Sequence, residues 1–361
     1  MRSTEAVVRA ACSESQLFVA DLFAGAGGIT AGFRSAGFIP VAAVECDIWA
    51  ARSYAENFGA HVLAGRIEDV VVERCQGFLT WTGPGLRIWP VELKTPEADV
   101  LVGGPPCQGF SPLGRIVNCE RDDPRNKLWR HYVRVLSATR PKAFVIENVP
   151  EFLKSDEFEQ LLEYVAALGY STAFRVLNAF DFGVPQRRKR AIVIGSRIGV
   201  ASLPSGDTFS RRTVRDAIGD LPIWPDGKNW HIGRNPTPVS LERYRAVPPG
   251  GNRFDLMRNR PDITPRCWLN KPRGSTDVFG RMKWDEPAPT IRTEFFKPEK
   301  GRYLHPEADR PITIREAARL QTFPDDFVFV GSSVQVAKQI GNAVPVELGR
   351  RIATHIIHML N

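Results

Sequence analysis

Short apolar runs alternate with segments of helical periodicity through the first part of the chain. The runs are "LFVADLF" (17–23), "PVAAVE" (40–45), "ADVLVGG" (98–104), "KAFVIENV" (142–149) and "AIVIGS" (191–196). The helical segments between them are 27–36, 48–57, 126–138 and 158–168. Nearly all-apolar strands are typical of parallel sheets buried on both faces. The pattern therefore predicts an α/β fold, a doubly wound, mostly parallel, Rossmann-like sheet.

Polar residues with reactive or ligand-binding side chains follow several of these runs. Ligands of such sheets bind beyond the carboxyl ends of the strands. Asp21, Glu45, Cys107 and Glu147 all lie at or just after the end of an apolar run. We therefore expect them at one edge of the sheet.

The pattern changes near residue 202. Residues 201–300 hold 13 of the chain's 28 prolines, together with four tryptophans, and show little helical periodicity. Disordered segments are poor in aromatic residues, so a small loop-rich domain is expected here. Helical periodicity resumes in 313–321 and 344–360. The predicted organisation is a first domain over 1–200, the loop-rich domain over 201–300 and a return to the first domain over 301–361.

Charge and cysteine usage narrow the class of protein. The net charge is +8, of which residues 201–300 contribute +6. Clustered Lys and Arg gain affinity for phosphates by counterion release, so a polyanionic partner is favoured, although solvated surfaces are often basic too. The six cysteines form no CxxC pair, which predicts a cytoplasmic protein with neither a zinc site nor a disulfide framework. No apolar run is long enough for a membrane span.

The turn after the first apolar run is rich in glycine. In "DLFAGAGG", glycine backbone allows a ligand to approach the start of the following helix, although a tight turn without a ligand uses the same residues. Glu45 follows Gly25 by 20 residues, close to the spacing of the ribose-binding carboxylate in dinucleotide folds. Because the GxGxxG fingerprint of NAD sites is missing, S-adenosylmethionine fits better than NAD.

Three further stretches carry candidate chemistry. Cys107 follows a Gly-Gly-Pro-Pro turn, a placement that favours a nucleophile over the small buried residue that an isolated cysteine usually is. Glu147 ends "KAFVIE" and is a candidate acid that donates a proton to a ring nitrogen. In "PQRRKR", alternation before the strand at 191–196 predicts that Arg188 and Arg190 point into the site, although such runs are often solvated turns.

Taken together, these motifs resemble those of the bacterial-type cytosine carbon-5 DNA methyltransferases. "DLFAGAGG" is similar to the family's cofactor motif, "GGPPCQGFSPLG" to its nucleophile loop, "ENVP" to its acid motif and "PQRRKR" to its arginine motif. "RPITIREAARLQTFPDDF" and "QIGNAVP" resemble its two closing motifs. The motifs occur in the family's order and extend from about Asp21 to Glu347.

The resemblance implies a mechanism. Cys107 is expected to attack carbon 6 of a cytosine flipped out of double-stranded DNA, while Glu147 protonates or hydrogen-bonds ring nitrogen 3. Carbon 5 then takes the methyl group of S-adenosylmethionine, and loss of the carbon-5 proton frees Cys107. Arg188 is expected to orient Glu147 and the base, with Arg190 beside it.

The resemblance also implies binding residues. The expected cofactor contacts, around the glycine turn and the closing motif, are Phe23, Ala24, Gly25, Gly27, Gly28, Glu45, Cys46, Ile67, Asp69, Pro105, Asn342, Ala343 and Val344. DNA contacts are expected at Gln108, Ser111 and Thr293, and 201–300 becomes the target recognition domain.

One residue departs from the family pattern. Where the family usually has an aspartate that contacts the cofactor's adenine, this chain has Arg66. Glu68, Asp69 or the backbone of Ile67 is expected to take over, or the cofactor binds more weakly.

Three alternative functions follow from the same features. A branch of the family methylates transfer RNA, but the basic, Trp-rich insert favours DNA. A DNA-binding protein without catalysis would not need Cys107, Glu147 and the arginines. An NAD oxidoreductase leaves the Pro-Pro-Cys loop unexplained. We therefore expect a monomeric methyltransferase without a metal, solitary or paired with a restriction endonuclease of the same site.

Overall fold

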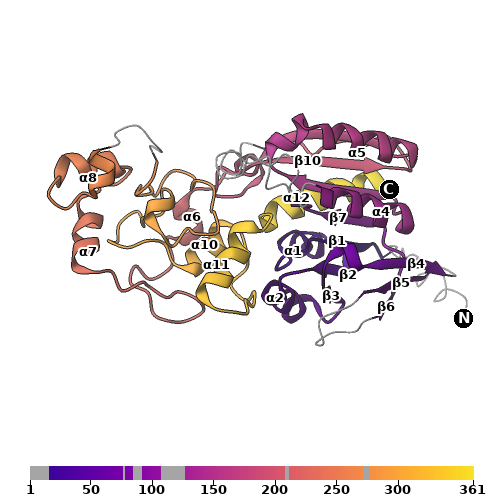
Figure 1. Cartoon of the computed structure of the whole chain (residues 1–361), viewed down its shortest axis with the longest axis horizontal. Helices are drawn as coiled ribbons and strands as arrows, with labels where there is room; N and C mark the ends of the chain where they lie inside the picture. The colour runs from indigo at the N-terminus through magenta and orange to yellow at the C-terminus, as the bar shows by residue number, and fades with distance from the viewer. Residues whose placement is uncertain (1–15, 76–77, 84–91, 107–126, 208–210, 271–276) are drawn as a thin grey trace, which may run out of the picture.

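The computed structural model describes residues 16–75, 78–83, 92–106, 127–207, 211–270 and 277–361. Its centre is a seven-stranded sheet of order β3-β2-β1-β7-β8-β10-β9 (Figure 1). The strands are β1 (Phe18–Leu22), β2 (Ile39–Glu45), β3 (Val62–Ala64), β7 (Val100–Gly103), β8 (Ala143–Asn148), β9 (Ser171–Asn178) and β10 (Lys189–Ser196). Strands β3, β2, β1, β7 and β8 are parallel, and β10 is antiparallel to both its neighbours. The predicted α/β fold with a mostly parallel sheet is confirmed.

Helices cover both faces of this sheet. On one face lie α1 (Gly28–Ser35), α2 (Ile48–Phe58) and α12 (Val346–Leu360), and on the other lie α4 (Leu128–Thr139) and α5 (Asp156–Ala167). Alternate β1 residues serve the two faces, since Val19 packs with α1 and α12 whereas Ala20 packs with α4. Short 3₁₀ turns complete the connections: η2 (Ile67–Asp69), η5 (Pro150–Lys154), η6 (Ala179–Phe182) and η7 (Pro298–Lys300).

A second, three-stranded antiparallel sheet was not predicted. It consists of β4 (Val71–Cys75), β5 (Phe78–Thr82) and β6 (Glu92–Pro96). Trp81 on β5 is fully buried, and its indole N–H donates to Thr95 on β6. The sheet packs its apolar side on the α4 face of the main core.

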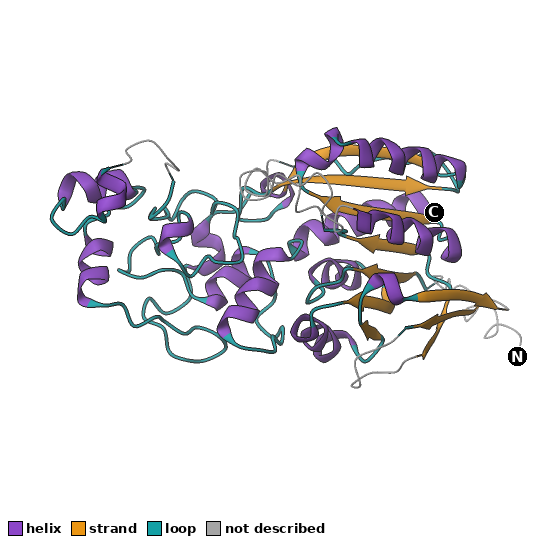
Figure 2. Ribbon diagram, in the orientation of Figure 1, coloured by secondary structure: helices purple, strands orange, loops and turns teal. Residues whose placement is uncertain are grey.

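The loop-rich region contains only short helices among its described residues. They are α6 (Val214–Ile218), α7 (Pro238–Arg245), α8 (Arg253–Asn259) and α9 (Arg266–Leu269). Figure 2 shows that loops make up most of this part of the molecule, which lies beside the sheet domain. No helix in the described part of the chain is both long and apolar enough to cross a membrane.

The C-terminal segment divides between the two parts of the molecule. Helices α10 (Ile314–Leu320) and α11 (Ser333–Asn342) share a hydrophobic core with α6 and with residues 282–295 of the insert. Helix α12 packs against α1 and the sheet, while α11 contacts α2 and Ala31 of α1 belongs to the core that α10 and α11 share. The boundary expected at residue 301 therefore does not coincide with a change of core, because the apolar faces of α10 and α11 are buried by the insert.

Candidate active site at the strand ends

The turn between β1 and α1 has an unusual backbone. Phe23, Gly25 and Gly27 have φ of 60°, 56° and 94°, in the left-handed region. A Cβ on Gly25 would meet no atom within 4 Å, so the space beside this residue is open. A Cβ on Gly27 would lie 2.3 Å from the Phe58 ring, so only glycine fits there. The turn thus has open space beside Gly25 and tight packing at Gly27, where the chain enters α1.

Glu45 closes one side of this turn. Its carboxylate accepts backbone N–H groups from Gly25 at 2.8 Å and from Asp47 at 2.7 Å. Burial raises the pKa of Glu45, and these two hydrogen bonds oppose the rise. Each carboxylate oxygen has a second lone pair, so Glu45 can also accept hydroxyl groups of a ligand. The exposed Cys46 follows it.

The segment around Arg66, the residue that differs from the family pattern, lies next to Glu45. The Gly65 N–H donates to the Glu45 carbonyl at 3.0 Å, which places η2 beside the strand end. The Arg66 guanidinium pairs with the Glu68 carboxylate at 2.7 Å, and Arg134 from α4 donates to the Ile67 carbonyl. Of the two carboxylates expected to replace the missing aspartate, Glu68 is therefore paired with Arg66, whereas Asp69 is exposed.

The closing motif reaches the same turn from the far end of the chain. A Cβ on Gly28 would lie 2.5 Å from the Val344 carbonyl oxygen and 3.1 Å from the Ala343 Cβ. Asn342 ends α11, immediately before these residues. Glycine at position 28 therefore permits the closing segment to pack directly on the start of α1.

Glu147 lies at the end of β8, on the other side of β7. Its Oε2 would lie 3.2 Å from a Cβ on Gly104, and the Asn148 side chain donates to the Pro105 carbonyl at 3.1 Å. Arg190 Nε lies 2.8 Å from Glu147 Oε1 in a largely buried ion pair. That oxygen still has no hydrogen bond from any described residue. The carboxyl group is thus held at the end of β8 by its ion pair with Arg190.

The two arginines make different contacts. Arg190, and not Arg188, forms the ion pair with Glu147. The fully buried Arg188 guanidinium donates to the carbonyls of Ile291 at 3.1 Å and Gly341 at 3.2 Å. Burial, together with the nearby Arg190, lowers the pKa of Arg188 to about 9. Arg188 is therefore bound to backbone carbonyls, one of them in the segment that returns from the insert, and Arg190 is the arginine that pairs with the Glu147 carboxylate.

The remaining predicted residues are only partly placed. Cys107, Gln108 and Ser111 lie outside the described residues, although Pro105, just before them, lies at the Glu147 edge. The Thr293 backbone packs against Gly341, the residue before Asn342, since a Cβ on Gly341 would lie 2.4 Å from the Thr293 nitrogen.

Asp21, on β1, has no role predicted from the sequence beyond its place at a strand end. Its side chain is buried and accepts the Thr30 hydroxyl at 2.5 Å, and its other oxygen has no hydrogen bond among the described residues. Burial raises the pKa of Asp21 to about 8, and the negative charge of Glu45 adds to the rise. The carboxyl is therefore largely protonated near neutral pH.

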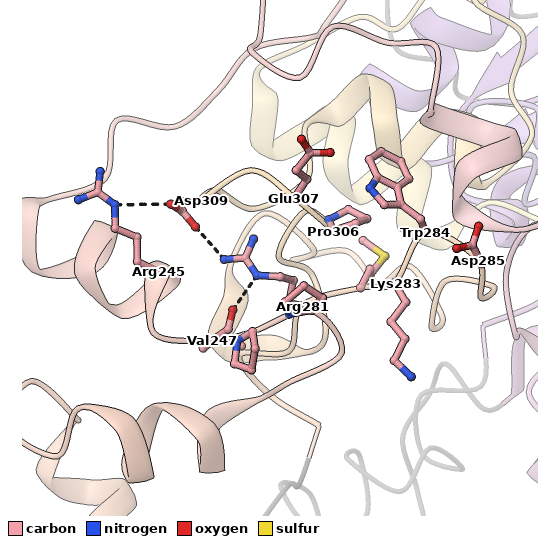
Figure 3. Close-up of a pocket in the computed structure, with 12 residues that line it drawn as sticks. Arg245, Val247, Arg281, Lys283, Trp284, Asp285, Pro306, Glu307 and Asp309 are labelled. Carbon is pink, nitrogen blue, oxygen red and sulfur yellow. Dashed lines mark hydrogen bonds and ion pairs between the residues drawn. The ribbon is translucent and has the colours of Figure 1, made fainter.

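A described pocket of about 560 Å³ lies elsewhere, between the insert and residues 306–309. Figure 3 shows Arg281, Trp284, Asp285 and Glu307 among the residues that line it. None of the candidate site residues predicted from the sequence lines it. In the described part of the chain, no group of three or more His, Cys, Asp or Glu side chains is arranged to hold a metal ion.

Comparison with known proteins adds a family context. A family model described as "C-5 cytosine-specific DNA methylase" matches residues 17–358. The chain is 35% identical to the Type II methyltransferase M1.HphI of Haemophilus parahaemolyticus, over 94% of this chain and 86% of the relative. It is 32% identical to the Type II methylase M.HgiDII of Herpetosiphon aurantiacus, over 95% of each.

Solved structures show a similar fold. A putative DNA modification methyltransferase encoded within an E. coli prophage has a TM-score of 0.71, with 24% identity, and the match covers 96% of this chain and 100% of that chain. The Entamoeba histolytica methyltransferase EhMeth has a TM-score of 0.68, with 15% identity and the same coverage.

Proposed function

Because the chain belongs to the C-5 cytosine-specific DNA methylase family, and is accordingly a DNA (cytosine-5-)-methyltransferase, we propose that it methylates a flipped-out cytosine within a specific duplex sequence through a covalent Cys107 adduct. The observation that carries this proposal is the Glu147–Arg190 pair at 2.8 Å, beside the strand that leads to Cys107. This ion pair supports the proposal that Glu147, as the acid, and Cys107, as the nucleophile, act at the ends of adjacent strands.

The open turn between β1 and α1 would hold S-adenosylmethionine. Gly25 leaves open space, and Glu45 can accept the ribose hydroxyls while it holds two backbone N–H groups. Phe23 and the backbone of Ala343 and Val344 would line the same pocket. When bound, S-adenosylmethionine supplies an electrophilic methyl group and leaves as S-adenosylhomocysteine. Asp69→Ala should weaken its binding in calorimetry, and unchanged affinity would remove Asp69 from the pocket.

The protein's residues would divide the remaining chemistry. The Cys107 thiolate forms a bond to carbon 6, and Glu147 gives a proton to ring nitrogen 3, so electron density moves to carbon 5. Arg190 holds Glu147 in place while it is charged. After methylation, a base removes the carbon-5 proton, the bond from carbon 6 to sulfur breaks, and the nitrogen-3 proton returns to Glu147.

Recognition of DNA would belong to the basic insert. Its net charge of +6 supports contacts to phosphates, and arginines there would read base edges in the major groove. Flipping exposes carbons 5 and 6 of the cytosine, which stacking hides. Since the relatives are named as Type II enzymes, we further propose that a restriction endonuclease cuts the same site.

Transfer of labelled methyl groups tests this function. The protein should label duplex DNA and not transfer RNA, and Glu147→Gln should lower kcat by about 10²-fold or more, because it removes the general acid. Glu163→Gln, on the exposed face of α5, is the matched control and should keep full activity. Equal activity of Glu147→Gln and wild type would exclude Glu147 as the acid.

A further inference from the structure

Two buried glutamines, Gln186 and Gln321, connect the arginine motif to the segment that closes the cofactor pocket. We propose that they are positioning residues that couple the placement of the Glu147–Arg190 pair to that of Ala343 and Val344. The inference rests on the proposed function, because it assigns these two places to one reaction.

Gln186 anchors the start of the arginine segment. It is fully buried, and its Oε1 accepts the Ile291 N–H at 2.9 Å. Its Nε2 donates to the Leu320 carbonyl at 3.1 Å and to Gln321 Oε1 at 2.9 Å. One amide group therefore joins the approach to β10, the segment returning from the insert and the end of α10.

Gln321 continues the connection to the cofactor side. It is also fully buried, and its Nε2 donates to the carbonyls of Ile340 at 2.7 Å and Ala343 at 3.3 Å. Its backbone carbonyl accepts the Val346 N–H at 3.1 Å, at the first residue of α12. Gln321 thus holds the closing segment from both sides of Val344.

Arg188 forms a second connection parallel to the glutamines. Its guanidinium bridges the carbonyls of Ile291 and Gly341, so the returning segment and the end of α11 are tied to the same strand that carries Arg190. In Figure 1, the yellow chain passes from α11 to α12 at this junction between the two parts of the molecule.

The glutamine pair has energetic reasons to act as a unit. Both side-chain amides are buried, so a donor or acceptor that loses its partner destabilises the fold, because water cannot reach it to form a hydrogen bond. Loss of Gln186 leaves Gln321 Oε1 without its donor, and loss of Gln321 leaves one of the two Nε2 protons of Gln186 without its acceptor. A shift of β10 is therefore transmitted to the carbonyl of Ala343, and a shift of Ala343 is transmitted to Arg190.

The test is the affinity of the purified full chain for S-adenosylhomocysteine, measured by calorimetry. Gln186 contacts none of the predicted cofactor residues, yet Gln186→Met should weaken binding about fivefold, the effect of one net hydrogen bond. Gln321→Met should do the same, and the double variant should be no weaker than either single variant, because they remove one shared connection. With duplex DNA, both should also lower kcat.

Gln339→Met is the matched control. Gln339 is a buried glutamine on α11 with two side-chain hydrogen bonds, but its partners are Ser53 and Val330. It should lower Tm to a similar extent and leave the affinity unchanged. If Gln186→Met does not fold, Gln186→Glu, which keeps the acceptor for Ile291, replaces it.

Two results separate the possible failures. Unchanged affinity in Gln186→Met, or equal weakening in Gln339→Met, would overturn the coupling while the proposed function stands. A wild-type chain that binds no S-adenosylhomocysteine and transfers no methyl group would overturn the proposed function and this inference with it.

Discussion

At the scale of single residues, the proposed chemistry would depend on which arginine reaches the Glu147 carboxylate. Arg190 forms the ion pair with Glu147, whereas Arg188 satisfies two backbone carbonyls. Strand alternation predicted that both side chains point the same way, because they are two residues apart. It could not predict their division of roles, since the partners of Arg188 come from Ile291 and Gly341, far along the chain.

The two arginines should therefore respond differently to substitution. Arg190→Gln should lower kcat by about 10²-fold as well as Tm, because it releases the carboxylate that the largely buried ion pair holds in place. Arg188→Gln should mainly lower Tm, because two buried carbonyls lose their donors. Methyl-transfer assays and thermal melts of both variants check this. The reverse pattern would contradict this division of roles between the two arginines.

Asp21 gives a prediction about pH. Its pKa is raised from 3.8 to about 8 by burial, so the folded protein binds this proton more tightly than the unfolded chain does. Its contribution to stability is therefore complete below about pH 4 and declines as the pH rises to about 8. Asp21→Asn should remove this decline.

Thermal melts between pH 5 and 8 measure the effect. The Tm of the wild type should fall relative to that of Asp21→Asn as the pH rises, and the comparison cancels groups that both proteins share, Glu45 among them. Parallel curves for the two proteins would show that Asp21 titrates alike in the folded and unfolded states.

At the scale of secondary-structure elements, the apolar strands β1, β2, β7, β8 and β10 were predictable, whereas β3, β9 and the small sheet were not. Strands such as β7 are uniformly apolar because both faces are buried. The edge strand β9 instead exposes much of its length, and β4 to β6 form a small sheet with mixed burial. Their local pattern resembles that of loops, so only tertiary packing determines them.

The contact between α1 and α12 is a second case in which distant segments determine the structure. A Cβ on Gly32 would lie 2.5 Å from both the Val346 carbonyl oxygen and the Arg350 nitrogen. Gly32→Ala should therefore lower the free energy of unfolding by about 1–3 kcal/mol in urea denaturation.

Because α12 begins directly after the cofactor-closing segment, Gly32→Ala should also weaken binding of S-adenosylhomocysteine. Gly199→Ala is the control, since a Cβ there would meet no atom within 4 Å. If Gly32→Ala is as stable as this control, α1 packs on α12 less tightly than the distances at Gly32 imply.

At the scale of the whole molecule, the sheet domain and the insert are joined by the C-terminal segment. The apolar runs predicted that Asp21, Glu45 and Glu147 lie at or near the ends of β1, β2 and β8, because each residue closes or follows such a run. The sharing of one core by α10, α11 and the insert was not predictable, since amphipathic helices do not specify their partners. That shared core connects the basic insert to the segment at Ala343.

Bisulfite sequencing of DNA from a bacterial host that expresses this chain tests the proposed methylation most directly. We predict 5-methylcytosine at one position of a defined sequence throughout the host genome, and its loss when Cys107→Ala is expressed at the same level. Absence of 5-methylcytosine from every defined sequence with the wild-type chain, or undiminished methylation with Cys107→Ala, would contradict methylation through a Cys107 adduct.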